Sequence, residues 1–134
     1  MKLPSEINAI SFGFEQLELW KKIRAFKIEI RKETQRFPKE EKYRLTDQLM
    51  RSSRSINALV AEGHGRFTFA DQLHFCIQAR GSLFETINHL IDAYDEGYIS
   101  EEGLYYFKSL GKEIERLLNG YIGYLRSKRD VQKK

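Results

Sequence analysis

The segment from Gln48 to Glu85 most constrains the fold, because it carries small and charged residues at helical spacing where bundle helices usually carry Leu or Ile. It includes Arg51-Ser52-Ser53-Arg54, then Ala61-Glu62-Gly63, and later Ala79-Arg80-Gly81-Ser82. Small side chains allow two helix backbones to approach closely. A charge near such a seam needs a partner, because an unpaired buried charge is unstable. We therefore expect closely packed helices whose Arg and Glu side chains pair.

Length and composition favour one helical domain. A chain of 134 residues has the usual size of a single domain, and only 2 prolines interrupt it. We expect residues 1–134 to form one domain, with a core over about 14–126 and mobile tails at 1–13 and 127–134. The single cysteine excludes an intrachain disulfide. Because no continuous hydrophobic run indicates a signal peptide or a membrane span, we predict a cytoplasmic protein without membrane contact.

Apolar residues repeat at steps of three and four in four successive segments, which predicts four helices over about 15–36, 41–63, 68–96 and 100–125. Thr68 and Ser100 are the expected starts of the last two helices. On the third helix we expect a core-facing set of Leu73, Ile77, Arg80, Phe84, Ile87, Ile91 and Tyr94. On the fourth helix the set is Leu104, Phe107, Gly111, Ile114, Leu118, Tyr121 and Leu125. Short connections predict an all-α, antiparallel up-down-up-down four-helix bundle.

Some apolar residues fall outside these faces. Leu17 and Ile28 project nearly opposite the core face of the first helix, which favours self-association. The fourth helix has a second stripe, formed by Leu110, Leu117 and Tyr124. A broad core-facing surface explains that stripe equally well.

Positive charge is concentrated in part of the chain. Residues 21–66 contain 13 Lys or Arg and 6 Asp or Glu, whereas residues 67–125 contain 4 and 9. One hypothesis is a nucleic-acid-binding stripe that contacts phosphates; its members are Lys42, Arg44, Arg51, Arg54 and Arg66. An ordinary solvated helix surface is an equally good interpretation. Some of these residues also fit a structural polar network that fixes helix register; its members are Arg51, Glu62, Arg66, Arg80 and Glu85.

No catalytic or metal-binding pattern is evident. A di-iron bundle needs two Glu-x-x-His motifs, and the nearest match is Asp71-Gln72-Leu73-His74. His64, His74 and His89 lack zinc-type spacing, and we expect each at the surface or at a helix cap. Cys76 is expected to be a packed, inert thiol. We therefore predict a protein that is not an enzyme and has no metal or cofactor.

Short motifs in a fixed order connect the chain to a known family. They are Leu17-Glu18-Leu19-Trp20-Lys21-Lys22, Phe37-Pro38 with Glu41, Leu45-Thr46-Asp47-Gln48-Leu49, Ser55-Ile56, Ala61-Glu62-Gly63, Gly65-Arg66, and Ala79-Arg80-Gly81-Ser82 with Glu85. In these motifs the chain resembles the small four-helix-bundle proteins named after 23S rRNA intervening sequences, over roughly residues 14–125. It departs from them at Met50, Arg54, Asn57 and Leu59, where the family usually has Arg, an apolar residue, Pro and Asn.

The resemblance implies an antiparallel bundle that assembles with itself, with homopentameric barrels among relatives, and no established enzymatic activity. Related accessory proteins of diversity-generating retroelements use a similar basic pentamer to engage reverse transcriptase and RNA. The expected partners are thus further copies of the chain, together with RNA or DNA or a nucleic-acid-processing protein. The alternative is an oligomeric protein-interaction scaffold that binds no nucleic acid.

Overall fold

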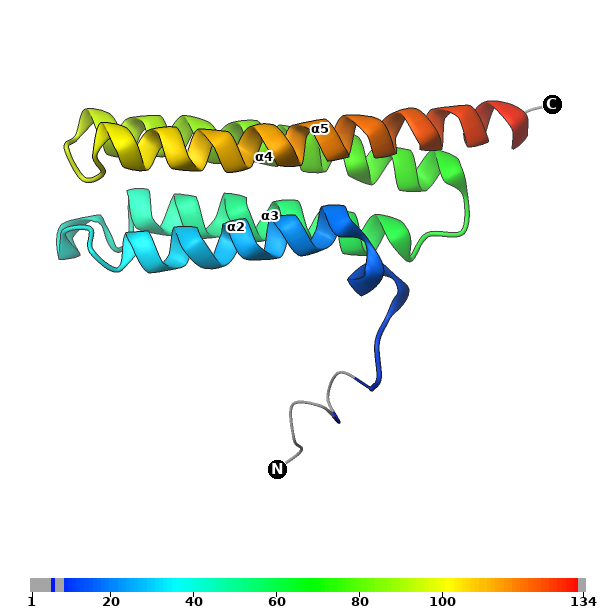
Figure 1. Cartoon of the computed structure of the whole chain (residues 1–134), viewed down its shortest axis with the longest axis horizontal. Helices are drawn as coiled ribbons and strands as arrows, with labels where there is room; N and C mark the ends of the chain where they lie inside the picture. The colour runs from blue at the N-terminus through cyan, green and yellow to red at the C-terminus, as the bar shows by residue number, and fades with distance from the viewer. Residues whose placement is uncertain (1–5, 7–8, 133–134) are drawn as a thin grey trace.

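The computed structural model describes residue 6 and residues 9–132, which form a bundle of four long helices. The elements are η1 (Gly13–Gln16), α2 (Glu18–Thr34), η2 (Lys39–Glu41), α3 (Leu45–His64), α4 (Phe69–Asp95) and α5 (Glu101–Gln132). Each long helix runs back along the one before it, and α4 and α5 lie together over α2 and α3 (Figure 1). The predicted all-α, up-down-up-down bundle is confirmed. Residues 1–5, 7–8 and 133–134, which belong to the predicted mobile tails, lie outside the described residues.

Helix starts follow from local capping. The hydroxyl of Thr68 accepts a hydrogen bond from the backbone N–H of Asp71 at 3.1 Å, and that of Ser100 accepts one from Gly103 at 3.0 Å. Both satisfy an N–H group that has no partner within the helix. Between α4 and α5 the backbone turns at Gly97, whose φ of +80° is unfavourable for other residues. The predicted starts at Thr68 and Ser100 are confirmed.

Three predicted boundaries are wrong. The first helix is interrupted at Leu17, whose extended backbone separates η1 from α2. The second begins at Leu45, after the short turn η2, rather than at residue 41. The fourth continues to Gln132, although residues from 127 onward were expected to be mobile. No Gly or Pro follows Gly123, and cations near the end of a helix interact favourably with its dipole, which explains this extension.

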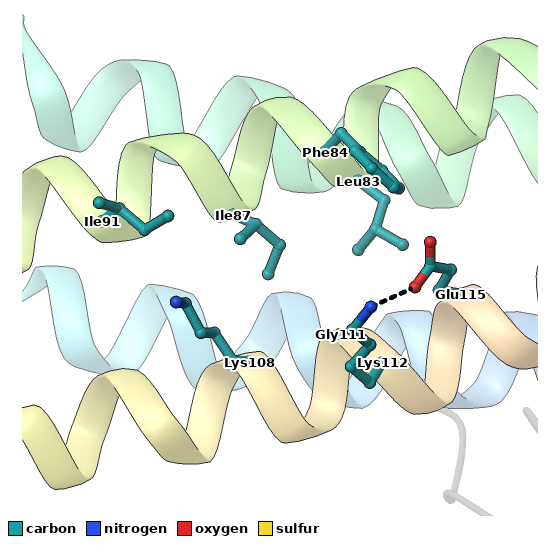
Figure 2. A pocket seen from close by; sticks show the side chains of 8 residues that line it. All are labelled: Leu83, Phe84, Ile87, Ile91, Lys108, Gly111, Lys112 and Glu115. Atoms are coloured by element: carbon teal, nitrogen blue, oxygen red, sulfur yellow. Dashed lines mark hydrogen bonds and ion pairs between the residues drawn. The ribbon is translucent and has the colours of Figure 1, made fainter.

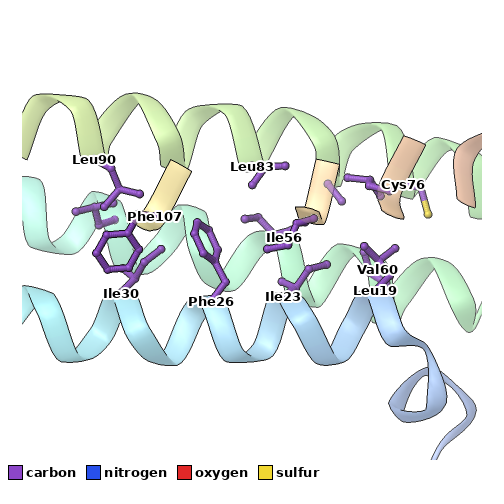
Figure 3. Close-up of a cluster of buried hydrophobic side chains, with 14 of the residues drawn as sticks. Leu19, Ile23, Phe26, Ile30, Ile56, Val60, Cys76, Leu83, Leu90 and Phe107 are labelled. Carbon is purple, nitrogen blue, oxygen red and sulfur yellow. The ribbon is translucent and has the colours of Figure 1, made fainter. Parts of the chain in front are cut away.

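The core lies where all four helices meet (Figure 3). On α2 the buried apolar residues are Leu19, Ile23, Phe26 and Ile30, and the rings of Phe26 and Phe107 pack edge to face with centroids 6.3 Å apart. On α5 they are Leu104, Phe107, Ile114, Leu118, Ile122 and Leu125, with Gly111 also buried. The predicted face of α5 is correct except that Ile122, rather than Tyr121, is buried.

The predicted face of α4 is correct only in part: Leu73 is buried and Ile87 and Ile91 pack against the core, but the other apolar members do not. The buried residues are Leu73, Cys76, Ala79, Leu83, Thr86, His89, Leu90 and Ala93. Ile77, Phe84 and Tyr94 are exposed instead, by 45%, 48% and 38%. The reason is close packing against α3, where a hydrogen bond of 2.8 Å joins the hydroxyls of Thr86 and Ser52. Large side chains on this face of α4 would hold the two helices apart.

The residues expected to form outward apolar stripes behave differently from one another. Leu110 and Leu117 of α5 pack against the core, as the broad core-facing interpretation predicts. Leu17 also packs against the core, so the prediction that it projects outward is wrong. Ile28 is half-buried, and Tyr124 is exposed. No helix in the described part of the chain is long and apolar enough to cross a membrane.

A candidate nucleic-acid interface on helices α2 and α3

Polar contacts fix the position of α2 against α3. The ammonium of Lys27 donates a hydrogen bond to the side-chain oxygen of Asn57 at 2.9 Å. The side-chain amide of the buried Asn57 donates in turn to the carbonyl of Trp20 at 3.4 Å. One end of the Lys27 side chain is therefore held at the seam between the helices. An ammonium has three donors, and this contact uses one of them.

Three cations converge at this seam, and we call Arg24, Lys27 and Arg54 the α2–α3 basic cluster. Arg24 lies one helical turn before Lys27 on α2, and Arg54 lies one turn before Asn57 on α3. Burial lowers the pKa of Lys27 from its ordinary value of 10.5, and repulsion from the guanidinium groups of Arg24 and Arg54 lowers it further. Among residues 9–132, no carboxylate forms an ion pair with any member of the cluster.

The opposite edge of α2 is different. There Glu29 and Glu33 border a hollow next to Tyr106 and Phe107 of α5. Glu29 pairs with Lys32 of α2 at 3.7 Å, and Glu33 pairs with Arg36, just after the end of α2, at 2.9 Å. Arg24 and Lys27, which have no carboxylate partner among residues 9–132, therefore lie at the edge of α2 that faces α3. The aromatic ring of Trp20 marks the same edge, because the guanidinium of Arg24 lies 5.7 Å from its centre.

Of the five residues of the predicted stripe, Arg54 alone belongs to the cluster. Arg51 forms an ion pair with Asp47 at 3.1 Å, and its side chain is 80% exposed. Arg66 lies beyond the other end of α3, where it pairs with Glu62 at 3.0 Å and covers the ring of Phe75 at 4.6 Å. Both cations are thus partly neutralised.

The other two stripe residues precede α3. The ammonium of Lys42 lies 5.3 Å from the ring centre of the exposed Tyr43. Arg44 borders a polar hollow that it shares with the carboxylates of Glu41, Asp92, Asp95 and Glu96. Four nearby acids repel phosphate, so we do not place Arg44 in the interface.

The predicted five-residue polar network is wrong as a single network, because most of its charges find nearer partners. Its Glu62–Arg66 pair does form, and Glu85 pairs with His89 one turn away, at 3.1 Å. Arg80 makes a structural ion pair as expected, but its partner is Glu115 of α5, at 3.3 Å. Because α4 buries a different face from the predicted one, Arg80 lies toward α5, where the side-chain oxygen of Asn119 also accepts a hydrogen bond from it at 3.0 Å. The expectation that each histidine lies at the surface or at a cap is wrong for His89, which is buried within α4.

A family model described as 23S rRNA-intervening sequence protein matches residues 15–120. The chain belongs to this family. The matched range contains the whole α2–α3 basic cluster and most of the bundle, whereas the last part of α5 lies outside it.

The bundle is similar to a solved structure, that of a protein of unknown function from the S23 ribosomal protein family of Bacteroides thetaiotaomicron. The two structures superpose with a TM-score of 0.73, and the two sequences are 24% identical. The alignment covers 78% of the present chain and 95% of the other. The comparison with curated proteins found no match. The similarity therefore supports the bundle and does not establish what this member of the family binds.

Two members of the cluster, Arg24 and Lys27, were missed by the sequence prediction. With Arg31 they are spaced by three and four residues, which places them on one edge of a helix. That spacing was available in the sequence. It did not indicate that this edge would meet α3, where Asn57 holds Lys27 and Arg54 lies nearby.

A second surface feature is an apolar groove between α4 and α5, with a volume of about 250 Å³. Figure 2 shows Leu83, Ile87 and Ile91 projecting from α4 toward α5. Lys108 and Lys112 border the groove on α5, where Lys112 pairs with Glu115 at 3.1 Å. Phe84 borders the groove, whereas the exposed Ile77 is separated from it by Arg80, whose guanidinium lies 4.6 Å from the centre of the Phe84 ring.

Proposed function

We propose that the protein is a non-enzymatic, self-associating bundle that binds RNA or DNA through backbone phosphates at the α2–α3 basic cluster. The observation that carries the proposal is the convergence of Arg24, Lys27 and Arg54 without a carboxylate partner in the described chain. Other cations of α2 and α3, such as Lys21, Lys32 and Arg51, pair with a carboxylate on their own helix. Like charges held together destabilise a fold unless an anion offsets them, and phosphate is the anion that such clusters commonly bind.

The cluster suits backbone contact better than base reading. Guanidinium groups form paired hydrogen bonds with phosphate oxygens, and these contacts carry no sequence information. The aromatic side chain beside the cluster, Trp20, is half-buried and packs against Phe14, so its ring is not free to stack on a base. We therefore expect binding with little sequence preference. Self-association would repeat the cluster around an oligomer and raise the apparent affinity for a long strand. A pentamer is the assembly that the family resemblance favours.

The test is fluorescence anisotropy of purified, nuclease-treated protein with a short structured RNA and a DNA duplex of equal length, from low salt to above physiological salt. We expect the logarithm of the affinity to fall linearly with the logarithm of salt concentration. Reversing one contacting charge, as in Arg54→Glu or Arg24→Glu, should weaken binding to every sequence and reduce the salt slope by roughly one unit.

Lys128→Glu is the matched control, because Lys128 is an exposed cation near the end of α5, away from the α2–α3 seam. It changes net charge by the same amount as the test variants. Equal losses in all three variants would mean that binding follows total charge and not the cluster. No binding of either nucleic acid at low salt would refute the proposal.

The apolar surface of α4 favours a second candidate, an oligomeric scaffold that binds other proteins and no nucleic acid. Phe84 is 48% exposed beside the α4–α5 groove, and Ile77 lies two turns before it. Exposed apolar side chains beside an apolar groove are typical of protein interfaces. Both candidates include self-association, and they differ in whether nucleic acid binds.

Sedimentation velocity distinguishes the roles of the two surfaces. Phe84→Glu should lower the oligomer mass, whereas Arg54→Glu should leave it unchanged. Under the scaffold candidate, wild-type protein forms oligomers and shows no salt-dependent binding to RNA or DNA. A wild-type protein that stays monomeric at micromolar concentration would contradict self-association in both candidates.

A further inference from the structure

The α2–α3 basic cluster has the geometry of a site for one compact, highly charged anion. Lys27 is only partly exposed, and its ammonium is fixed by the hydrogen bond to Asn57. The side chains of Arg24 and Arg54 are exposed on either side, one from each helix. Two exposed guanidinium groups, one from each helix, thus flank the recessed ammonium of Lys27.

The number of donors and charges selects among phosphate groups. A phosphodiester in a strand has one negative charge and two free oxygens, and a nucleoside is attached on each side. A phosphate monoester has three free oxygens and a charge of about −1.5 to −2 at pH 7. It can therefore reach a recessed ammonium and two guanidinium groups at once, and it offsets more of their mutual repulsion.

We propose that the α2–α3 basic cluster recognises a phosphate monoester, with Lys27 contacting the phosphate at the seam and Arg24 and Arg54 contacting it from α2 and α3. The inference rests on the proposed function, since it names the chemical group that the same face prefers. Two sources present this group, namely the terminal phosphate of a nucleic-acid strand and a free phosphate ester. The chemistry of the site is the same for both.

The chain contains an optical reporter for the site. Trp20 is the only tryptophan of the 134 residues, its carbonyl accepts from Asn57, and Arg24 lies over its ring. An anion that draws Arg24 toward Lys27 should change the fluorescence of Trp20. Ribose 5-phosphate is a suitable probe because it carries a monoester and no light-absorbing base, and ribose is its uncharged control.

The experiment has two arms at constant ionic strength. In the first, Trp20 fluorescence is titrated with ribose 5-phosphate and with ribose. In the second, anisotropy compares two RNA oligomers of one sequence that carry either a 5′-phosphate or a 5′-hydroxyl. We expect a saturable change with ribose 5-phosphate only, and at least fivefold tighter binding of the 5′-phosphorylated RNA.

Three variants separate the site from total charge. Lys27→Gln keeps a donor for Asn57 but removes the charge, and Arg54→Gln alters an exposed residue that the fold does not require. Both should abolish the preference for the 5′-phosphate. Lys22→Gln removes an exposed cation from the same helix outside the cluster, and it should retain the preference. Thermal unfolding of each variant verifies that it is folded.

The outcomes separate this inference from the proposed function. Equal binding of the two RNAs, with no response to ribose 5-phosphate, would overturn the monoester site and leave backbone binding intact. A response to ribose 5-phosphate that Lys27→Gln removes, without binding of either RNA, would support the site for a free ester and overturn the proposed function. If ribose 5-phosphate gives no fluorescence response and neither RNA binds, both the monoester site and the proposed function are overturned.

Discussion

Gly63 is where α3 and α4 approach so closely that a methyl group does not fit. A Cβ added at Gly63 would lie 2.9 Å from the Cβ of Phe75 and 3.3 Å from the carbonyl oxygen of Gln72. Both atoms are fixed by the backbone of α4, so neither can rotate away. To reach an ordinary contact, the helices must separate locally by roughly 0.5–1 Å, which loosens the packing around the seam.

The expected effect of Gly63→Ala combines two opposing contributions. Overpacking of a tight interior destabilises by about 1–3 kcal/mol, whereas Ala stabilises a helix interior by about 1 kcal/mol relative to Gly. The entropy of unfolding of a 134-residue domain is about 0.28 kcal/mol per kelvin near its midpoint. We therefore expect the melting temperature of Gly63→Ala to fall by as much as about 7 °C.

Gly81→Ala is the matched control, because Gly81 lies within α4 and a Cβ there meets no atom within 4 Å. It retains the helix-propensity gain alone and should melt about 2–4 °C above wild type. The difference between the two variants isolates the overpacking contribution and should be about 4–11 °C. Circular dichroism melts at one protein concentration provide the measurement. If Gly63→Ala melts with or above Gly81→Ala, the close approach of α3 and α4 is refuted.

Three further predictions concern the interior and one ion pair. Burial raises the pKa of Cys76 from 9.0 to about 11, so at pH 8 the folded protein should react with a disulfide reagent roughly a hundredfold more slowly than an exposed cysteine does; fast labelling without denaturant would contradict this. A double-mutant cycle for Arg80 and Glu115 should give a coupling energy under about 1 kcal/mol, because the Arg80 side chain is 42% exposed and water screens the ion pair. A coupling energy above about 2 kcal/mol would show that water does not screen this pair. Thr86→Val removes the donor to Ser52 and should lower the free energy of unfolding by about 1 kcal/mol in urea titrations, whereas an unchanged midpoint would show that this buried hydrogen bond contributes nothing.

The two helices α4 and α5 show what a hydrophobic pattern can and cannot predict. On α5 the large apolar residues form a single main stripe, and that stripe is buried almost as expected. On α4 the sequence offers a large set that includes Phe84 and a small set that includes Ala79 and Thr86. Hydrophobicity favours the large set, but the small residues of α3, such as Ser52, require a small partner surface. The choice depends on volume complementarity between two helices, which one helix read alone does not reveal.

The candidate interface was predictable only in part for a similar reason. The excess of positive charge over residues 21–66 indicated Arg54, and local pairs such as Glu62 with Arg66 follow from spacing on one helix. The contact of Lys27 with Asn57 joins residues 30 positions apart, and that of Arg80 with Glu115 joins residues 35 apart. Such contacts depend on how each helix is rotated in the bundle.

On α4 the small residues lie inside and several large ones lie outside, so helix packing and surface character depend on different positions of the same helix. Ala79 and Thr86 are buried in the close packing of the bundle, whereas Ile77 and Phe84 lie half in solvent and outside its buried core. The outer positions can therefore diverge among relatives without loss of the fold. A lineage that exchanges these side chains acquires a different surface on an unchanged scaffold.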